Sequence, residues 1–229
     1  MKKMNNLQAI LWDFDGTLVD STQKNHNVTK RILSEFENSM KFSNLNLNQY
    51  LLALSKSKNW YELYMNHFGL SEIETVKAGK LWSKYQLEDD TPVNIFDGLI
   101  DVLETSQSIK HGIVSQNSKD NIKKLLIELQ LDRYFQAIIG YEEVELDHQK
   151  PHPEGILNCL DEMSVTSGKV VYIGDNETDI YTAINADKKL REIKICTIGV
   201  DFENERNRKH WKIQPDFIIN NFRDLSRLF

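Results

Sequence analysis

Aspartates are the residues of this sequence whose types and spacing most directly suggest chemistry. Asp13 and Asp15 stand two residues apart in Asp-Phe-Asp-Gly-Thr, where an apolar run ends at a glycine. Alternation along an extended strand places both carboxylates on one side, and Gly16 permits the sharp turn that exposes them. Two such carboxylates repel each other unless a cation lies between them or one holds a proton. The motif therefore predicts a Mg²⁺ site, a general acid, or both.

A second acidic group follows another apolar run. Asp175 comes directly after residues 170–174 (VVYIG), and Asp179 lies one helical turn further along the chain. Asp175 is placed to complete a metal site, and Asp179 to bind the metal through water or to orient a lysine. The structural alternative for Asp179 is a helix N-cap.

The remaining polar groups come from Lys150 and from residues 115–117, which directly follow an expected strand over 111–114. Lys150 precedes Pro-His-Pro, which restricts it to an extended backbone and opens the next helix. Its ammonium could neutralise an attacking carboxylate and a phosphoryl oxygen together. Ser115, Gln116 and Asn117 offer a hydroxyl and N–H groups that can bind phosphoryl oxygens without adding charge. Such a strand end is, by itself, more often a cap or a turn.

Short apolar strands alternating with helices must position these residues. The pattern predicts strands over 7–14, 111–114, 137–140, 169–173, 193–198 and 217–219, and helices over 98–107, 119–129, 153–162 and 179–186. This alternation indicates right-handed crossovers and the α/β class, with a Rossmann-like three-layer core around a parallel sheet. The motifs then share the carboxyl edge of the sheet, where open α/β folds bind ligands.

One long stretch departs from this alternation. Residues 21–91 are helical in pattern and poor in glycine and proline, and no strand is expected there. We therefore expect an α/β core formed by residues 1–17 and 93–229, with an all-helical insertion over 18–92. The mixed-charge run 201–212 is expected to be a solvated loop or helix face.

Composition limits the possible partners. The chain has 229 residues, of which 40% are apolar and 27% charged, a composition typical of a globular protein. Its formal charge of -6 would repel a polyphosphate backbone, which disfavours nucleic-acid binding. Cys159 and Cys196 lie far apart and outside any cysteine–histidine cluster, so neither a disulfide framework nor a zinc site is expected. No apolar run approaches the ~20 residues of a membrane helix or resembles a signal peptide. We expect a cytoplasmic monomer or homodimer that binds neither membranes nor nucleic acids.

The motifs resemble those of the haloacid dehalogenase superfamily of phosphohydrolases, and in particular its phosphoglycolate phosphatase-like group. The resemblance covers nearly the whole chain and rests on DFDGT followed by LVDS at 13–21, IVSQN at 113–117, KPHPEG at 150–155 and IGDNETDI at 173–180. It implies that Asp13 is both nucleophile and metal ligand, and that Asp15 protonates the leaving group and then activates water. It also implies that residues 18–92 are a helical cap.

The candidate residues therefore fall into three groups. The catalytic group is Asp13, Asp15 and Lys150. The substrate-binding group is Thr17, Ser115, Gln116, Asn117 and Lys150. Within this group the resemblance implies that Ser115 and Asn117 hold the phosphoryl group and that Lys150 balances charge. The metal-binding group is Asp13, Asp15, Asp175 and Asp179, with Mg²⁺ as the expected cofactor.

The sequence thus predicts an enzyme, a Mg²⁺-dependent phosphatase that hydrolyses a small phosphorylated metabolite through an aspartyl-phosphate. A phosphomutase or phosphonate hydrolase of the same fold is an alternative, because residues of the insertion would make that difference. A dehalogenase would need neither Asp15 nor Asp175. A non-enzymatic receiver-like phospho-acceptor module is a further alternative, although such modules are roughly half this length and carry no helical insertion. The physiological substrate is left open.

Overall fold

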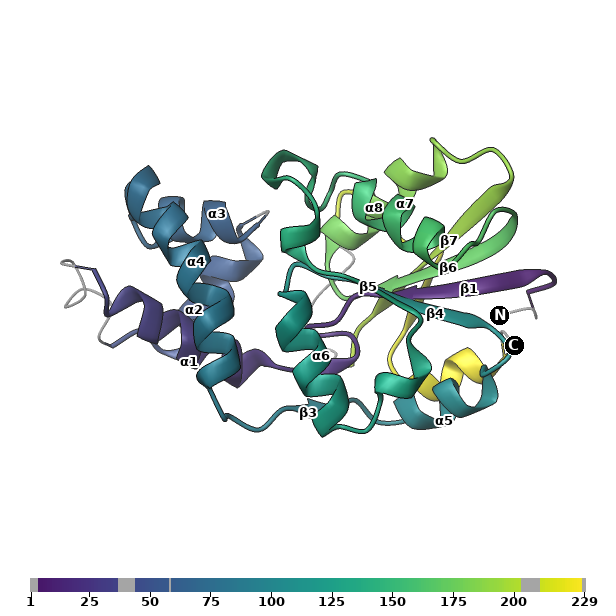
Figure 1. The fold of residues 1–229 in the computed structure, drawn as a ribbon, viewed down its shortest axis with the longest axis horizontal. Coiled ribbons are helices and arrows are strands. Elements are labelled where there is room, and N and C mark those ends of the chain that lie inside the picture. The colour runs from purple at the N-terminus through teal and green to yellow at the C-terminus, as the bar shows by residue number, and fades with distance from the viewer. Residues whose placement is uncertain (1–3, 37–43, 58, 203–210, 228–229) are drawn as a thin grey trace. The chain divides into compact units, whose positions relative to one another are not determined.

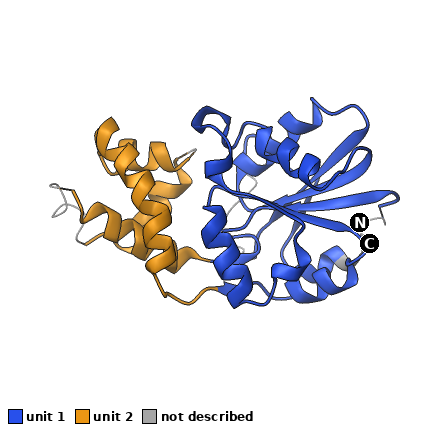
Figure 2. Cartoon of the chain, in the orientation of Figure 1, with its two compact units in different colours: residues 1–20, 94–229 blue, residues 21–93 orange. Residues whose placement is uncertain are grey.

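The chain forms two compact units, shown in different colours in Figure 2. The computed structural model describes residues 4–36, 44–57, 59–202 and 211–227. The first unit comprises residues 1–20 and 94–229 and is here called the α/β unit. The second comprises residues 21–93 and is called the helical unit.

A six-stranded sheet forms the centre of the α/β unit, and every neighbouring pair of its strands is parallel. The strand order is β5-β4-β1-β6-β7-β8, so the first strand lies between β4 and β6 (Figure 1). This arrangement confirms the α/β class expected from the sequence. The strands are β1 Leu7–Trp12, β4 Lys110–Val114, β5 Ala137–Ile139, β6 Gly168–Gly174, β7 Ile193–Val200 and β8 Phe217–Ile219.

Helices cover both faces of this sheet. Within its described residues, the α-helices of the unit are α5 Leu99–Thr105, α6 Lys119–Glu128, α7 Glu154–Glu162 and α8 Glu177–Asp187. On one face α7 packs on β4 and β5, and α8 packs on β6 and β7. On the other face α5 packs against the short helix η7 Phe222–Arg227. Further 3-10 turns are η3 Asp132–Tyr134, η4 Tyr141–Glu143 and η5 Leu146–His148.

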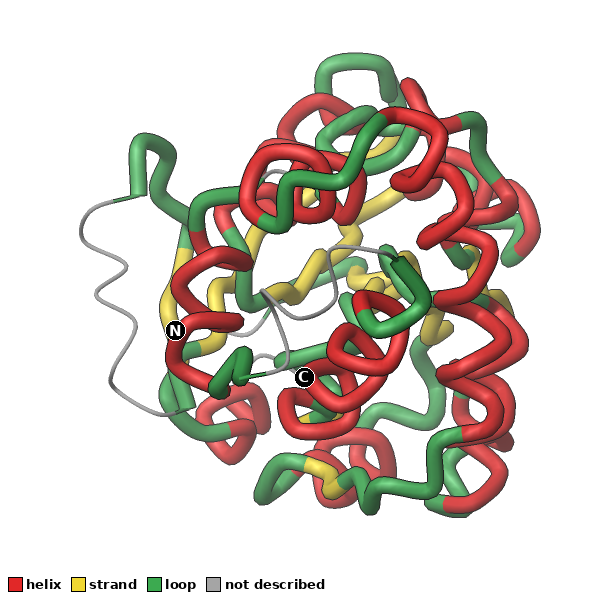
Figure 3. The backbone as a smooth tube through the Cα atoms, turned by 90° about the vertical axis from the view of Figure 1, so that its left-hand side faces the viewer, coloured by secondary structure: helices red, strands yellow, loops and turns green. Residues whose placement is uncertain are grey.

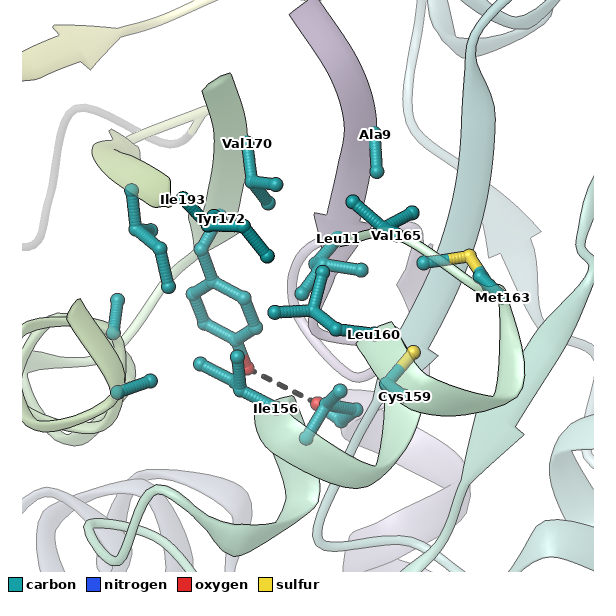
Figure 4. Close-up of a cluster of buried hydrophobic side chains, with 14 of the residues drawn as sticks. Ala9, Leu11, Ile156, Cys159, Leu160, Met163, Val165, Val170, Tyr172 and Ile193 are labelled. Carbon is teal, nitrogen blue, oxygen red and sulfur yellow. Dashed lines mark hydrogen bonds between the residues drawn. The ribbon is translucent and has the colours of Figure 1, made fainter. Parts of the chain in front are cut away.

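The central strand is buried on both faces, as expected for a parallel sheet with helices on each side. Ala9 and Leu11 point into a cluster with residues of α7 and α8, in which Tyr172 also lies (Figure 4). Trp12 points to the opposite face, where its ring meets Phe222 edge-on at 5.7 Å between centroids. The strand is thereby fixed in register by packing from both sides.

A two-stranded antiparallel ribbon, absent from our sequence-based expectations, lies where the chain leaves and re-enters the α/β unit. β2 Val19–Asp20 pairs with β3 Asn94–Ile95, in the register Val19 to Ile95 and Asp20 to Asn94. Strands of two residues are too short to show the period-2 alternation by which strands are recognised in a sequence.

The described residues of the helical unit form α1 Thr22–Leu33, α2 Leu47–Ser55, α3 Trp60–Glu62, the π-helix η2 Leu63–His67 and α4 Glu72–Glu88. Figure 1 labels the four α-helices, and Figure 3 draws the helices of the chain in red. The unit's described residues contain no strand, which agrees with the sequence pattern. The helices enclose an apolar core of their own that includes Val28, Tyr64 and Ala78. Side chains of Asn46 and Ser71 cap the first turns of α2 and α4, which satisfies backbone N–H groups there.

Two sequence-based expectations outside the site are only partly covered by the described chain. Of the charged run 201–212, residues 203–210 lie outside the described residues. None of the helices in the described part is long and apolar enough to cross a membrane.

Candidate active site

Two neighbouring strands bring Asp13 and Asp175 together. Trp12 of β1 pairs with Ile173 of β6, and the Asp13 N–H donates to the Ile173 carbonyl at 2.8 Å. The residues that follow the two strands therefore meet at one edge of the sheet. One carboxylate oxygen from each of Asp13, Asp175 and Asp179 lies within 4.8 Å of the other two. The candidate acids of the two distant motifs thus face the same small volume.

Helix α8 holds Asp179 in this group. The helix begins at Glu177, two residues before the expected start, because Asn176 is the N-cap and its side chain accepts from the Thr178 N–H. Asp179 is therefore not the N-cap. Its Oδ2 accepts the Asn176 N–H at 3.0 Å, while its Oδ1 accepts from Lys150. With both oxygens engaged by the protein, Asp179 is better suited to orienting Lys150 than to binding a metal directly.

Lys150 bridges two of the carboxylates. Its Nζ lies 2.7 Å from Asp13 Oδ1 and 2.7 Å from Asp179 Oδ1. Lys150 is only 7% exposed, and this burial lowers its pKa. The nearby Asp13 and Asp179 carboxylates outweigh burial, however, and hold the pKa of Lys150 well above its usual value. The ammonium is therefore charged and aimed at the Asp13 carboxylate.

The electrostatics of Asp13 favour a bound cation. Burial raises the pKa of Asp13, Lys150 partly opposes this, and Asp179 and Asp175 raise it further, so the pKa stays well above its usual value. When all three carboxyls of the group are ionised, a single ammonium leaves an excess of negative charge. A hard divalent ion would offset that charge, and carboxylate oxygens are the donors that Mg²⁺ prefers. Asp13 and Asp175 thus fit a magnesium site.

Gly16 lets the turn after β1 approach Asp175. Its φ is +74°, a conformation that residues with a side chain rarely adopt. A Cβ atom at this position would lie 2.5 Å from Asp175 Oδ2. Glycine is therefore needed twice, for the turn and for the close contact between its backbone and the carboxylate.

Asp15 and Asn117 form a pair beside this group. The Asp15 side chain is not part of the group made by Asp13, Asp175 and Asp179. Instead its Oδ2 accepts a hydrogen bond of 2.9 Å from Asn117 Nδ2. Asn117 Oδ1 accepts from the Ser118 N–H at 2.8 Å and from Asn121 Nδ2 at 3.2 Å, which fixes the orientation of the amide. Asn117 was expected to hold a phosphoryl group, but here its side chain holds a carboxylate.

The other candidate residues for phosphoryl binding differ in whether a ligand can reach their side chains. Ser115 Oγ accepts from the Asn117 N–H at 3.2 Å, so its hydroxyl hydrogen is still able to donate to a ligand. Ser115, Gln116 and Lys150 line one small hollow. Thr17 is completely buried, and its hydroxyl has no hydrogen-bond partner among the residues described. Of these residues, Ser115 and Gln116 are therefore placed to meet a ligand, and the Thr17 side chain is not.

Tyr172, for which the sequence predicts only a place in a buried strand, is also part of the site. Its buried hydroxyl donates to the Val114 carbonyl at 3.1 Å and lies 3.4 Å from Asp179 Oδ1 (Figure 4 marks the first bond). Its ring centroid lies 5.5 Å from Lys150 Nζ, a cation–π distance. The available signal was a phenol inside an otherwise aliphatic buried strand, since a buried hydroxyl requires a partner.

Comparison with known proteins places this geometry in a family. The family model described as haloacid dehalogenase-like hydrolase matches residues 10–191. A curated protein named pyrophosphatase PpaX from Listeria innocua is 27% identical over 222 residues, covering 96% of this chain and 94% of that protein. The protein of the same name from Oceanobacillus iheyensis is 25% identical, covering 96% and 95%.

Solved structures share the fold. A structure from Bacteroides fragilis, assigned by name to the haloacid dehalogenase-like hydrolases, aligns with a TM-score of 0.78 at 24% identity, covering 96% of this chain and 99% of that one. A protein from Haemophilus somnus, named a predicted phosphoglycolate phosphatase, aligns with a TM-score of 0.73 at 19% identity and 98% coverage of both chains. With the family match spanning most of the sequence, the chain belongs to the haloacid dehalogenase-like hydrolases.

Proposed function

We propose that this hydrolase is a Mg²⁺-dependent phosphatase that cleaves a small phosphomonoester through an aspartyl-phosphate on Asp13. The single observation that carries the proposal is the position of Asp13. Its carboxylate lies 2.7 Å from a buried ammonium and within 4.8 Å of two further carboxylates, at the carboxyl edge of the sheet. With a cation bound beside Lys150, such a site would gather positive charge around an anionic nucleophile and the anionic group that it attacks.

The reaction would proceed in two displacements. A carboxylate oxygen of Asp13 attacks phosphorus in line, a bond forms between them, and the bond from phosphorus to the leaving oxygen breaks. Asp15 donates its proton to that departing oxygen. Asp15, now ionised, then takes a proton from water as the water attacks phosphorus, which releases phosphate and restores Asp13. The Ser115 hydroxyl would donate a hydrogen bond to a phosphoryl oxygen in both steps, and the Lys150 ammonium would offset the negative charge of the phosphoryl group.

Asp13 and Asp175 would hold the magnesium ion, with Asp179 acting through Lys150. The bound ion would supply charge neutralisation for the transferring phosphoryl group. The support for this assignment is the donor chemistry of the acids and the excess of carboxylate over ammonium in their group. The side chain of Asp15 is assigned to proton transfer alone, because Asn117 holds it outside that group.

The comparisons favour a second candidate substrate. The curated relatives are named pyrophosphatases, and two of them cover 96% of this chain. Inorganic pyrophosphate is a phosphoanhydride whose leaving group is itself a phosphate, so the same two displacements would cleave it. A phosphomutase or a phosphonate hydrolase also stays open, because the helical unit would determine which leaving group reaches Asp13. We propose that this unit acts as the cap that selects the substrate.

Phosphate release tests the proposal. Purified protein is assayed with p-nitrophenyl phosphate, phosphoglycolate and inorganic pyrophosphate, in Mg²⁺ and in excess chelator. We expect steady turnover in Mg²⁺, and none detectable with chelator or in Asp13→Asn. Asp161→Asn, which changes an exposed acid on α7, is the matched control and should keep wild-type turnover.

Two results would contradict the proposal. Turnover that persists in Asp13→Asn would exclude Asp13 as the nucleophile. A single phosphorylation per chain without continued release would instead indicate a phospho-acceptor module. Acid-quenched protein that carries phosphate in the wild type, and none in Asp13→Asn, would support the covalent intermediate.

A further inference from the structure

A second group of metal-ligand side chains lies in the α/β unit, outside the acidic site. It comprises His148, His152 and Glu154, and one ligand atom from each lies within 4.8 Å of the other two. His148 ends the turn η5, and Glu154 begins helix α7. All three side chains are partly exposed, at 41%, 34% and 33% respectively. Solvent can therefore reach the group.

Both imidazoles present the same ring nitrogen towards the carboxylate. His148 Nδ1 lies 2.6 Å from Glu154 Oε2, and His152 Nδ1 lies 4.0 Å from the same oxygen. The two rings are stacked, with centroids 4.3 Å apart and planes inclined by 10°. The two Nδ1 atoms and the Glu154 oxygen are thus three potential ligand atoms that lie close together beside the stacked rings.

We propose that His148, His152 and Glu154 form a second metal site, which binds a borderline transition-metal ion with Zn²⁺ as its representative. Two imidazoles and a carboxylate are the donors that Zn²⁺ accepts, at distances of about 2.0–2.2 Å. Such distances require donors roughly 3.4 Å apart in a tetrahedral arrangement. Small side-chain rotations would bring the three donor atoms to this separation, with the ion lying between His148 Nδ1 and Glu154 Oε2 in place of their direct contact.

Two further observations favour a metal over a simple ion pair. The two histidines are separated by three residues, which falls within the His-x₃₋₅-His spacing of zinc sites. Both histidines also line the hollow that contains Ser115 and Lys150. The exposed side of the group leaves a coordination position open to water or to a ligand oxygen.

The site would fix the segment that carries Lys150. Lys150 lies between the two histidines in sequence. His152 Nδ1 accepts a hydrogen bond of 3.3 Å from the Glu154 N–H, which it would give up to bind the ion. An ion bound to all three side chains would link the turn η5 to the first turn of α7 across this segment. The inference about metal binding does not depend on the proposed phosphatase activity, because its readout is binding itself.

Zinc binding in the presence of magnesium tests the proposal. The full chain is titrated with Zn²⁺ by calorimetry in a large excess of Mg²⁺, which occupies hard oxygen sites, and with Co²⁺ by visible absorption. We expect one Zn²⁺ per chain, and a Co²⁺ spectrum typical of nitrogen and oxygen ligands. His148→Ala and His152→Ala should each weaken binding about tenfold or more. Circular dichroism of each variant checks folding, and His152→Gln provides a less disruptive replacement.

Matched variants assign the ion to this group. His67→Ala, which removes an exposed histidine of the helical unit, and Asp175→Asn should both bind Zn²⁺ as the wild type does. Absence of Zn²⁺ binding to the wild type would overturn the proposal. Unchanged binding in both His148→Ala and His152→Ala would do so too, as would loss of binding in Asp175→Asn, which would assign the ion to the acidic group.

Discussion

Asn117 Nδ2 donates a hydrogen bond of 2.9 Å to Asp15 Oδ2, between residues 102 positions apart in the sequence. The other side of the Asn117 amide is held by Ser118 and Asn121, so the donor cannot turn away without losing two bonds. The carboxylate proposed to move the proton is therefore oriented from the neighbouring strand end. Asn117 acts in this scheme as a positioning residue for Asp15.

Asn117→Ala should lower kcat/KM by roughly 10- to 100-fold for an ester with a poor leaving group, since a misplaced catalytic group loses about this much rate. The loss should be much smaller for p-nitrophenyl phosphate, whose leaving group departs without needing a proton. A general structural defect would lower both values equally. Asn158→Ala, which removes an exposed amide on α7, should show no such dependence on the leaving group.

Gly16→Ala should weaken magnesium activation because the new Cβ would lie 2.5 Å from Asp175 Oδ2. We expect the Mg²⁺ concentration for half-maximal activity to rise about tenfold or more as the carboxylate is displaced. Gly69→Ala is a matched control, since Gly69 has a similar φ of +69° but nothing within 4 Å of its Cβ position. Equal changes in the two variants would attribute the effect to backbone strain instead of to Asp175.

Tyr172→Phe should destabilise the α/β unit by about 1–3 kcal/mol, because the buried Val114 carbonyl loses its hydroxyl donor. Urea denaturation measures this change in the free energy of unfolding. Tyr61→Phe removes a hydroxyl from a half-exposed residue and should stay within about 0.5 kcal/mol of the wild type. A Tyr172→Phe protein as stable as the wild type would show that the bond contributes nothing.

His111 should make the protein less stable in mild acid. Burial lowers its pKa from 6.5 to about 4, while its neighbours Trp12, Ser106 and Phe135 carry no charge. Between these values the unfolded chain binds a proton that the folded chain excludes. The stabilisation is therefore complete above the unfolded pKa and is lost as pH falls towards the folded one, by up to about 3 kcal/mol.

His111→Asn removes this titration and keeps an acceptor for the Trp12 indole. The free energy of unfolding, measured from pH 8 to pH 4.5, should fall less steeply for this variant than for the wild type. His67→Asn, at an exposed position, should leave the slope unchanged. Parallel curves for wild type and His111→Asn would contradict the prediction.

The sequence by itself determined the α/β class and the strands that carry the site. Apolar runs ending in Asp13 and Asp175 indicated buried strands, and the alternation with helices indicated a parallel sheet. Parallel strands put their carboxyl ends at one edge, so the meeting of these two acids could be anticipated before any coordinates. The helices over 21–91 could also be predicted from the sequence, because the 3.6-residue period of apolar positions repeats over many turns.

Only the tertiary structure decided which polar group contacts which. Asn117 holds Asp15, Lys150 bridges Asp13 and Asp179, and the Tyr172 hydroxyl reaches Val114, all through contacts between distant segments. Periodicity records which face of an element is buried, a property of neighbouring residues in the chain. The partner of a side-chain donor depends instead on rotamers and distances that are set when separate strands pack, and the sequence carries no local pattern for these.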